Sequence, residues 1–142
     1  MRIALIPLLL LGTLSVDACR PAFAATPDAN NPAQCLASFY WLEYQTLKLT
    51  QRHHQAVWHL AVLQVYNASR LKTVGVTDLG KAESTAFLTA HYKDWDLMFD
   101  LAKKCAAIAQ ADPFFRAHEE EFATLALKVD PACKKDATVC TN

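Results

Sequence analysis

The sequence contains few residues that interrupt helices and carries no excess charge of either sign. Only 3 of its 142 residues are glycine and 6 are proline, and 14 basic side chains balance 14 acidic ones. A neutral protein lacks the long-range attraction that draws basic domains to nucleic acids, so we expect no nucleic-acid partner. The scarcity of glycine excludes a glycine-rich phosphate loop. No stretch alternates apolar and polar residues for long enough to predict a β-sheet, which leaves an all-α fold.

Long apolar runs are also absent, and none reaches the ~20 residues that span a bilayer. The longest, residues 4–14, follows a positively charged start and precedes Ala22-Phe23-Ala24, a pattern that signal peptidase recognises. We therefore predict a cleaved signal peptide over residues 1–24, export to the bacterial periplasm or beyond, and no transmembrane segment afterwards. The alternative is a lipoprotein signal, in which Cys19 would carry a lipid anchor.

The few breakers divide residues 25–142 into the helical segments of a single domain. Three prolines directly follow Asn or Asp, in the pairs Asn31-Pro32, Asp112-Pro113 and Asp130-Pro131. An Asn or Asp side chain can accept a hydrogen bond from the first turn, and proline fits the first helical position. These pairs predict helix starts near residues 32, 113 and 131, and Thr77-Asp78 predicts another after Gly75.

Apolar residues recur at steps of three and four within these segments, as they do on one face of a helix. We expect a small bundle of about four helices, over roughly 33–49, 52–73, 78–110 and 113–129, followed by a short tail that contains cysteines. The predicted apolar faces are Leu36, Tyr40, Tyr44 and Leu47 in the first helix, Val57, Ala61, Val65 and Ala68 in the second, Phe87, His91, Trp95, Met98, Ala102, Cys105 and Ala109 in the third, and Phe115, His118, Phe122, Leu125 and Val129 in the fourth.

A polar stretch, residues 48–55, separates the first two predicted helices. It is either an exposed part of one long helix, straight or kinked, or a turn between two helices, and we favour a break near residues 50–51. The choice decides which cysteines can meet. In one straight helix, at ~1.5 Å per residue, Cys35 would lie ~20 Å too far from Cys105 for a disulfide, whereas a bend would bring the two within reach.

Four cysteines lie beyond the predicted signal peptide: Cys35, Cys105, Cys133 and Cys140. An even number in an exported domain predicts disulfides, and the chain contains no CxxC, CxxCH or paired zinc-ligand spacing. We favour the pairs Cys35–Cys105 and Cys133–Cys140. The alternative joins Cys35 to the tail, as a strict up-down-up-down bundle would prefer.

The titratable side chains supply no catalytic pattern and only weak metal candidates. No two of the five histidines are three or four residues apart, the spacing that places two ligands on one helix face. His91 and His118 lie on predicted apolar faces, and either could join a carboxylate of a neighbouring helix at a metal. No serine has a nucleophile-elbow context, and Glu119-Glu120-Glu121 suits the start of the last helix. We expect no enzyme activity, no cofactor and no metal.

One aromatic cluster exceeds what a single helix face can bury. Phe39, Tyr40 and Trp41 are consecutive, and Tyr44 follows one turn later. Three consecutive residues span about 200° of a helix surface, so some of these rings face a second layer of the protein or a partner. If they form an interface, Trp41→Ala should weaken association without lowering the stability of the monomer.

The overall plan is similar to that of type VI secretion amidase immunity proteins, which block a toxic cell-wall amidase in the periplasm. The similarity lies in size, export, helicity and the wide separation of Cys35 and Cys105, and no motif transfers functional residues. We expect a periplasmic or secreted protein that acts through protein–protein contacts, as an inhibitor, an immunity-like protein or an envelope accessory factor. Its partner is another protein or a second copy in a homodimer. The alternative is a periplasmic helical bundle that binds a metal or small ligand through His91 and His118.

Overall fold

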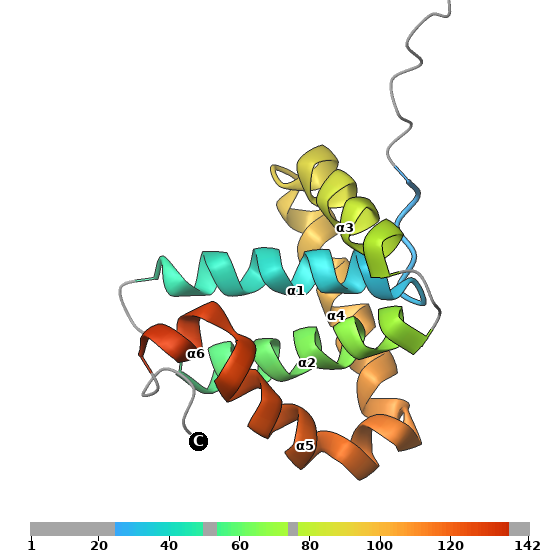
Figure 1. The fold of residues 1–142 in the computed structure, drawn as a ribbon. Helices are drawn as coiled ribbons and strands as arrows, with labels where there is room; N and C mark the ends of the chain where they lie inside the picture. Colours follow the sequence, from blue (N-terminus) through green and yellow to red (C-terminus); the bar gives the residue numbers. More distant parts are fainter. Residues whose placement is uncertain (1–24, 50–53, 74–76, 137–142) are drawn as a thin grey trace, which may run out of the picture.

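The structure, a computed structural model, describes residues 25–49, 54–73 and 77–136 (Figure 1). Within these ranges the chain forms six helices and no strand, which confirms the predicted all-α fold. The helices are α1 (Pro32–Leu47), α2 (His54–Thr73), α3 (Thr77–His91), α4 (Trp95–Ala111), α5 (Pro113–Val129) and α6 (Pro131–Lys135). None of the described helices combines the length and apolar character needed to cross a membrane. The predicted signal peptide and Cys19 lie outside the described residues.

Asn-Pro and Asp-Pro pairs begin three of these helices, as predicted. α1, α5 and α6 start at Pro32, Pro113 and Pro131. Before each proline, the Asn or Asp side chain accepts a hydrogen bond of 2.9 Å from a backbone N–H of the first turn. These caps satisfy donors that have no partner inside a helix, which explains why the pairs mark helix starts.

The prediction of one helix over 78–110 is wrong, because a turn divides it. α3 ends at His91 and α4 begins at Trp95. Asp94 makes the break: its side chain accepts a hydrogen bond of 3.1 Å from the N–H of Leu97, as a helix N-cap does. Neither glycine nor proline marks this turn in the sequence.

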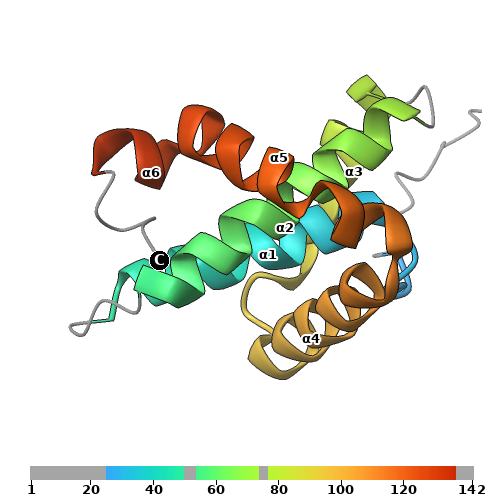
Figure 2. The ribbon, with the colours of Figure 1, turned by 90° about the horizontal axis from the view of Figure 1, so that it is seen from below.

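The first two helices form an antiparallel hairpin at the centre of the molecule. The chain reverses between Leu47 and His54, so α1 and α2 are separate helices. The favoured break at residues 50–51 itself lies outside the described ranges. α3 and α4 pack against α1, whereas α5 packs against α2. Figures 1 and 2 show α4 and α5 on opposite sides of the hairpin, with α4 crossing it steeply.

Because α2, α3 and α4 all pack against α1, this helix buries residues around most of its circumference. The face predicted for it is wrong: Tyr40, Tyr44 and Leu47 are exposed, and Phe39 and Trp41 are buried instead. The apolar faces predicted for the other helices agree better with the observed burial. Those buried as predicted are Val57, Ala61 and Val65 of α2, Phe87 of α3, Met98, Ala102, Cys105 and Ala109 of α4, and Phe115 and Phe122 of α5. Trp95, Leu125 and Val129 are exposed.

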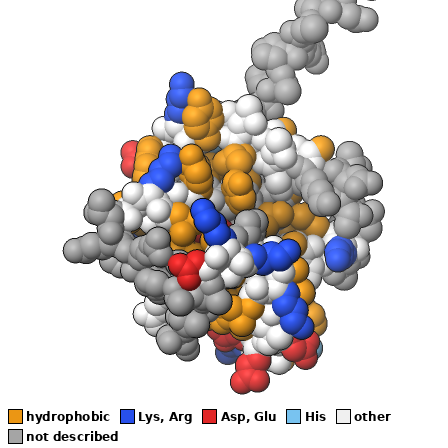
Figure 3. Space-filling model, turned by 60° about the vertical axis from the view of Figure 1, so that its left-hand side comes forward, with side chains coloured by type: hydrophobic (Ala, Val, Ile, Leu, Met, Phe, Trp, Pro, Cys, Tyr) orange, Lys and Arg blue, Asp and Glu red, His pale blue; other side chains and the backbone are white. Residues whose placement is uncertain are grey.

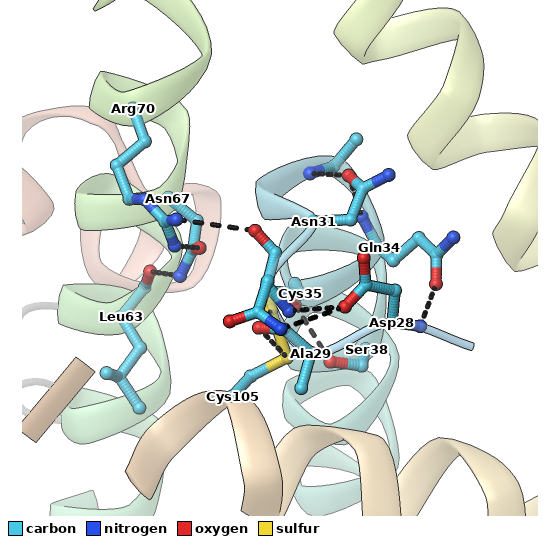
Figure 4. Close-up of a disulfide and its surroundings, with 12 residues drawn as sticks. Asp28, Ala29, Asn31, Gln34, Cys35, Ser38, Leu63, Asn67, Arg70 and Cys105 are labelled. Carbon is cyan, nitrogen blue, oxygen red and sulfur yellow. Dashed lines mark hydrogen bonds between the residues drawn. A yellow bond between two sulfur atoms is a disulfide. The ribbon is translucent and has the colours of Figure 1, made fainter. Parts of the chain in front are cut away.

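A disulfide joins Cys35 of α1 to Cys105 of α4, with their Cα atoms 5.6 Å apart (Figure 4). This confirms the favoured first pair. Two features bring the cysteines together: the reversal between α1 and α2, and the break before α4, which lets α4 cross α1. Cys133 is buried and is not a free thiol. Cys140 lies outside the described residues, so the second pair stays a prediction.

The chain before α1 lies over this disulfide. The carbonyl oxygen of Ala29 is 3.2 Å from Cys35 Sγ, a contact and not a hydrogen bond because a disulfide sulfur carries no proton. The buried Gln34 holds the segment on both sides, since it accepts from the N–H of Asp28 at 2.8 Å and donates to Thr26 O at 3.2 Å. We call residues 26–31 the N-terminal segment. From α2, Arg70 donates a hydrogen bond to Asn30 O of this segment (Figure 4).

Candidate functional site

The structure divides the four predicted interface aromatics into two buried and two exposed residues. Phe39 and Trp41 are 1% and 2% exposed, whereas Tyr40 and Tyr44 are 52% and 53% exposed. Both tyrosines lie on α1, one turn apart, and point away from the core. Whether they contact a partner stays a prediction, but only these two present large surfaces to one.

Trp41 forms the floor beneath this exposed pair. Its indole N–H donates a hydrogen bond of 2.9 Å to the carbonyl oxygen of Tyr92, in the turn between α3 and α4. Its ring meets that of Trp95 edge to face, with centroids 4.7 Å apart. Trp41 therefore fixes α1 to the α3–α4 turn, and the side chains above it rest on a rigid base.

Two adjoining depressions, of about 360 and 440 Å³, lie between α1 and α3. We call them together the α1–α3 groove. The side chains that line it are Leu36, Ala37, Tyr40, Trp41, Tyr44 and Gln45 of α1, Ser84, Thr85, Leu88 and Thr89 of α3, and Tyr92 of the following turn. None of these lining residues is charged, so the groove is a predominantly apolar surface with a few hydrogen-bonding groups.

The exposed aromatic surface continues from the groove onto α4. Tyr92, Trp95 and Phe99 are each about half exposed, and Trp95 and Phe99 lie one turn apart on α4. Figure 3 shows the side where α1 ends and α3 meets α4, with hydrophobic side chains next to those of lysine or arginine. Large contiguous apolar patches on protein surfaces often mark interaction sites.

A lysine lies over each of three exposed rings on this side. The Nζ atoms of Lys48, Lys93 and Lys103 are 3.9, 5.5 and 5.8 Å from the ring centroids of Tyr44, Tyr92 and Phe99. These distances fall within the range of cation–π attraction. The lysines therefore keep their charge at the edge of the aromatic surface.

Three acidic side chains near this surface have local partners. Asp94 caps α4, and Asp100 accepts a hydrogen bond from Lys104 at 2.7 Å, which lowers the pKa of that carboxyl. Glu83 lies toward the start of α1, where it accepts a hydrogen bond from Asn31. Asp94 and Asp96 are exposed and follow Lys93 in sequence, so the cationic character is confined to the lysines that lie directly over the rings of the groove.

A buried carboxyl pair, which the sequence did not predict, lies elsewhere on α1. Glu43 is 5% exposed and its Oε2 accepts a hydrogen bond from Gln64 of α2. Its other oxygen receives no hydrogen bond from the residues described. Asp130, equally buried, faces it and caps α6.

Burial raises the pKa of Glu43 to about 7, and the nearby charge of Asp130 adds to the rise, while the Gln64 hydrogen bond opposes it. A protonated Glu43 can donate to Asp130, whereas two ionised carboxylates would repel each other in the core. Glu43 lines none of five depressions formed by the described residues, between α1 and α3, between α2 and α5, and on α5. The pair therefore links α1 to the α5–α6 junction.

A second polar contact fixes the corner between α4 and α5. The hydroxyl of the buried Tyr66 donates to Asp112 at 2.5 Å, while Asp112 also caps α5 through the N–H of Phe114. Burial and this hydrogen bond raise the pKa of Tyr66 to about 12, and the same bond lowers the pKa of Asp112. Both groups serve the fold.

The weak metal candidates lie on helices that pack on different neighbours. His91 ends α3, which packs on α1, and its ring rests 4.6 Å from that of Phe87. His118 lies on α5, which packs on α2, and its Nδ1 is 2.9 Å from Phe114 O. Within residues 25–49, 54–73 and 77–136, no group of three or more His, Cys, Asp or Glu side chains could hold a metal.

A smaller depression of about 270 Å³ lies between α2, α4 and α5. Its rim carries three charged or titratable side chains, His59, Arg116 and Glu119, around an apolar floor. Next to it, Glu119, Glu120 and Glu121 border an open and mainly polar cleft. This side of the molecule therefore differs in chemistry from the aromatic side.

No protein-family model matches the chain, and no curated protein or solved structure is significantly similar to it. The case for a function therefore rests on the chemistry of these surfaces.

Proposed function

We propose that this is an exported, non-enzymatic protein that works through contacts with another protein, and that the α1–α3 groove is its contact surface. The observation that carries the proposal is the set of half-exposed aromatic rings around the groove. Aromatic side chains are enriched in the energetically dominant centres of interfaces, and here they line a concave, uncharged surface.

Rigidity of this surface supports the same conclusion. Tyr40 and Tyr44 project from a helix whose inner side is buried, and Trp41 holds that helix to the α3–α4 turn. Side chains held in place before binding lose little conformational freedom when a partner arrives. A surface built in this way suits a stable inhibitor, an immunity-like protein or an envelope accessory factor.

Export is supported by two independent observations. The first is the signal-peptide pattern over residues 1–24. The second is the Cys35–Cys105 disulfide, because such bonds persist mainly in oxidising compartments such as the periplasm. Fractionation of cells that express the full chain would test the location.

The contact surface is tested with the double variant Tyr40→Ala/Tyr44→Ala. We expect it to lose the partner that the purified mature protein captures from periplasmic extract, while its urea midpoint changes little because both rings are half exposed. Phe114→Ala is the matched control, since Phe114 is equally exposed but lies on α5. Sedimentation over a range of concentrations would show whether the partner is a second copy. Retention of the partner by the double variant would refute the proposal.

A second candidate function, binding of a metal or small ligand, has one observation in its favour. Nε2 of the partly buried His91 has no hydrogen-bond partner among the described residues. Calorimetric titration with Zn²⁺, Cu²⁺ and Ni²⁺ would test it. A metal that binds tighter than ~10 μM, with affinity lost in His91→Ala, would favour this function.

A further inference from the structure

We infer that the α1–α3 groove receives an amphipathic helix whose apolar ridge is flanked by acidic side chains. This inference rests on the proposed function and specifies the chemistry of the partner.

The groove has the shape and spacing of a helix-binding site. On α1, Leu36, Tyr40 and Tyr44 lie at successive steps of four residues, so their row is about 12 Å long. Leu88 and Tyr92 form a facing row with the same step. Two facing rows of large side chains leave a channel between them that the ridge of another helix can fill.

α3 follows α1 in the same sense along the groove and is inclined to it (Figure 1). Near the start of α1, Ser84 donates a hydrogen bond of 2.7 Å to Ala33 O. Near its end, Trp41 bonds to Tyr92 O at 2.9 Å. Both contacts join residues 51 positions apart, so the groove keeps its register along its length.

Charge distinguishes one end of the groove from the other. Lys48 and Lys93 stand at the end of α1 and just after α3, each over a tyrosine of the groove. The acidic Glu83 lies at the opposite end and is bonded to Asn31. Glu43, the only acid of α1, is buried and does not line the groove. Acidic residues on a partner would therefore meet two lysines at one end of the groove.

A concave site favours a helix over a membrane surface. Lysines and exposed aromatics also occur at bilayer interfaces, but a bilayer cannot fill a groove. The amide oxygen and amide nitrogen of Gln45 in the groove wall would also be left without partners by acyl chains. A peptide helix carries polar side chains that can meet both.

The test uses two synthetic amphipathic peptides. Both carry leucine at steps of four residues, and the leucines are flanked by glutamate in one peptide and by lysine in the other. Binding is followed by amide chemical shifts of the mature protein. We expect the glutamate peptide to bind at least about tenfold more tightly and to shift signals along the groove. In Lys48→Glu/Lys93→Glu the preference should reverse, whereas the control Lys134→Glu/Lys135→Glu on α6 should leave it unchanged.

Several outcomes would overturn the inference: equal affinity for both peptides, no binding of either, shifts outside the groove, or tighter binding to anionic vesicles than to the glutamate peptide. Self-association that fills the groove would also overturn it, in favour of a second copy. The native partner separates this inference from the proposed function. If the native partner is still captured by Lys48→Glu/Lys93→Glu but not by Tyr40→Ala/Tyr44→Ala, the groove is the contact surface and the acidic character of the partner is refuted. If both double variants still capture the native partner, the proposed function itself is refuted.

Discussion

The two ends of α1 differ in what surrounds them. At its start, α1 is enclosed: Cys35 is bonded to α4, Gln34 is bonded to the N-terminal segment, and Ser84 of α3 reaches its backbone. Toward its end, the same helix buries Trp41 and Glu43 but leaves Tyr40 and Tyr44 half exposed. The first end is secured by a covalent bond and hydrogen bonds, whereas the second presents rings and lysines to solvent.

This difference separates residues that maintain the fold from residues that are available for contact. A helix held firmly at one end can expose apolar side chains at the other without relying on them for stability. The contrast also explains why one aromatic cluster, residues 39–41, contains both core and surface residues: α2, α3 and α4 cover most of the circumference of α1 and leave one side uncovered.

The largest effect is expected at the enclosed end. Cys35→Ala/Cys105→Ala should lower the free energy of unfolding by about 4 kcal/mol, because the bond closes a loop of 70 residues in the unfolded chain. Urea unfolding of the variant and the oxidised wild type would measure the loss. A loss below about 1 kcal/mol would mean that the hydrogen bonds around this end suffice without the disulfide.

Trp41→Ala should have the next largest effect, a loss of about 3 kcal/mol, because it leaves a cavity and removes the hydrogen bond to Tyr92 O. The same measurement on Tyr44→Ala should show a change within about 0.5 kcal/mol. Similar losses for the two variants would show that the exposed end of α1 is part of the core after all. Because Trp41 is buried, we no longer expect Trp41→Ala to leave the stability of the monomer unchanged.

Glu43 should produce the smallest of the three effects, and one that depends on pH. Its carboxyl keeps its proton up to about pH 7 in the folded state, but only up to about pH 4.5 in the unfolded chain. Between these values the folded state binds more protons, so the unfolding free energy falls as pH rises, by on the order of 2 kcal/mol.

Urea unfolding at pH 5 and pH 7.5 would measure this slope. Glu43→Gln is the matched control, because its amide can still donate to Asp130 but does not titrate. The variant should lose this part of the pH dependence. An identical slope in both proteins would show that the carboxyl pair does not share a proton.

Local chemistry made the helix starts predictable. Pro32, Pro113 and Pro131 each follow a side chain that caps the first turn, and this signal depends on adjacent residues only. Asp94 carries the same type of signal without a proline, and it could have revealed the break between α3 and α4. The favoured Cys35–Cys105 bond was predictable as a choice among three pairings, but its geometry depends on that break.

The candidate site could be predicted only in part, since it depends on packing between distant segments. The spacing of Tyr40 and Tyr44 predicts a shared helix face but not its exposure, which follows from where α2, α3 and α4 pack. Leu88 and Tyr92 join the site only because α3 runs beside α1. Glu43 gave no signal, because a single acid in an apolar helix usually faces water.

The bond between Cys35 and Cys105 turns half of the chain into a covalent ring that includes all of α2 and α3. A protease that cuts once inside this ring opens it without releasing a fragment, since the two halves remain joined through sulfur. The nicked molecule would keep the mass of the intact one, plus a water, until a reductant separates its pieces. Outside the cell membrane, where proteases are common and reductants scarce, such a chain can survive its first cut.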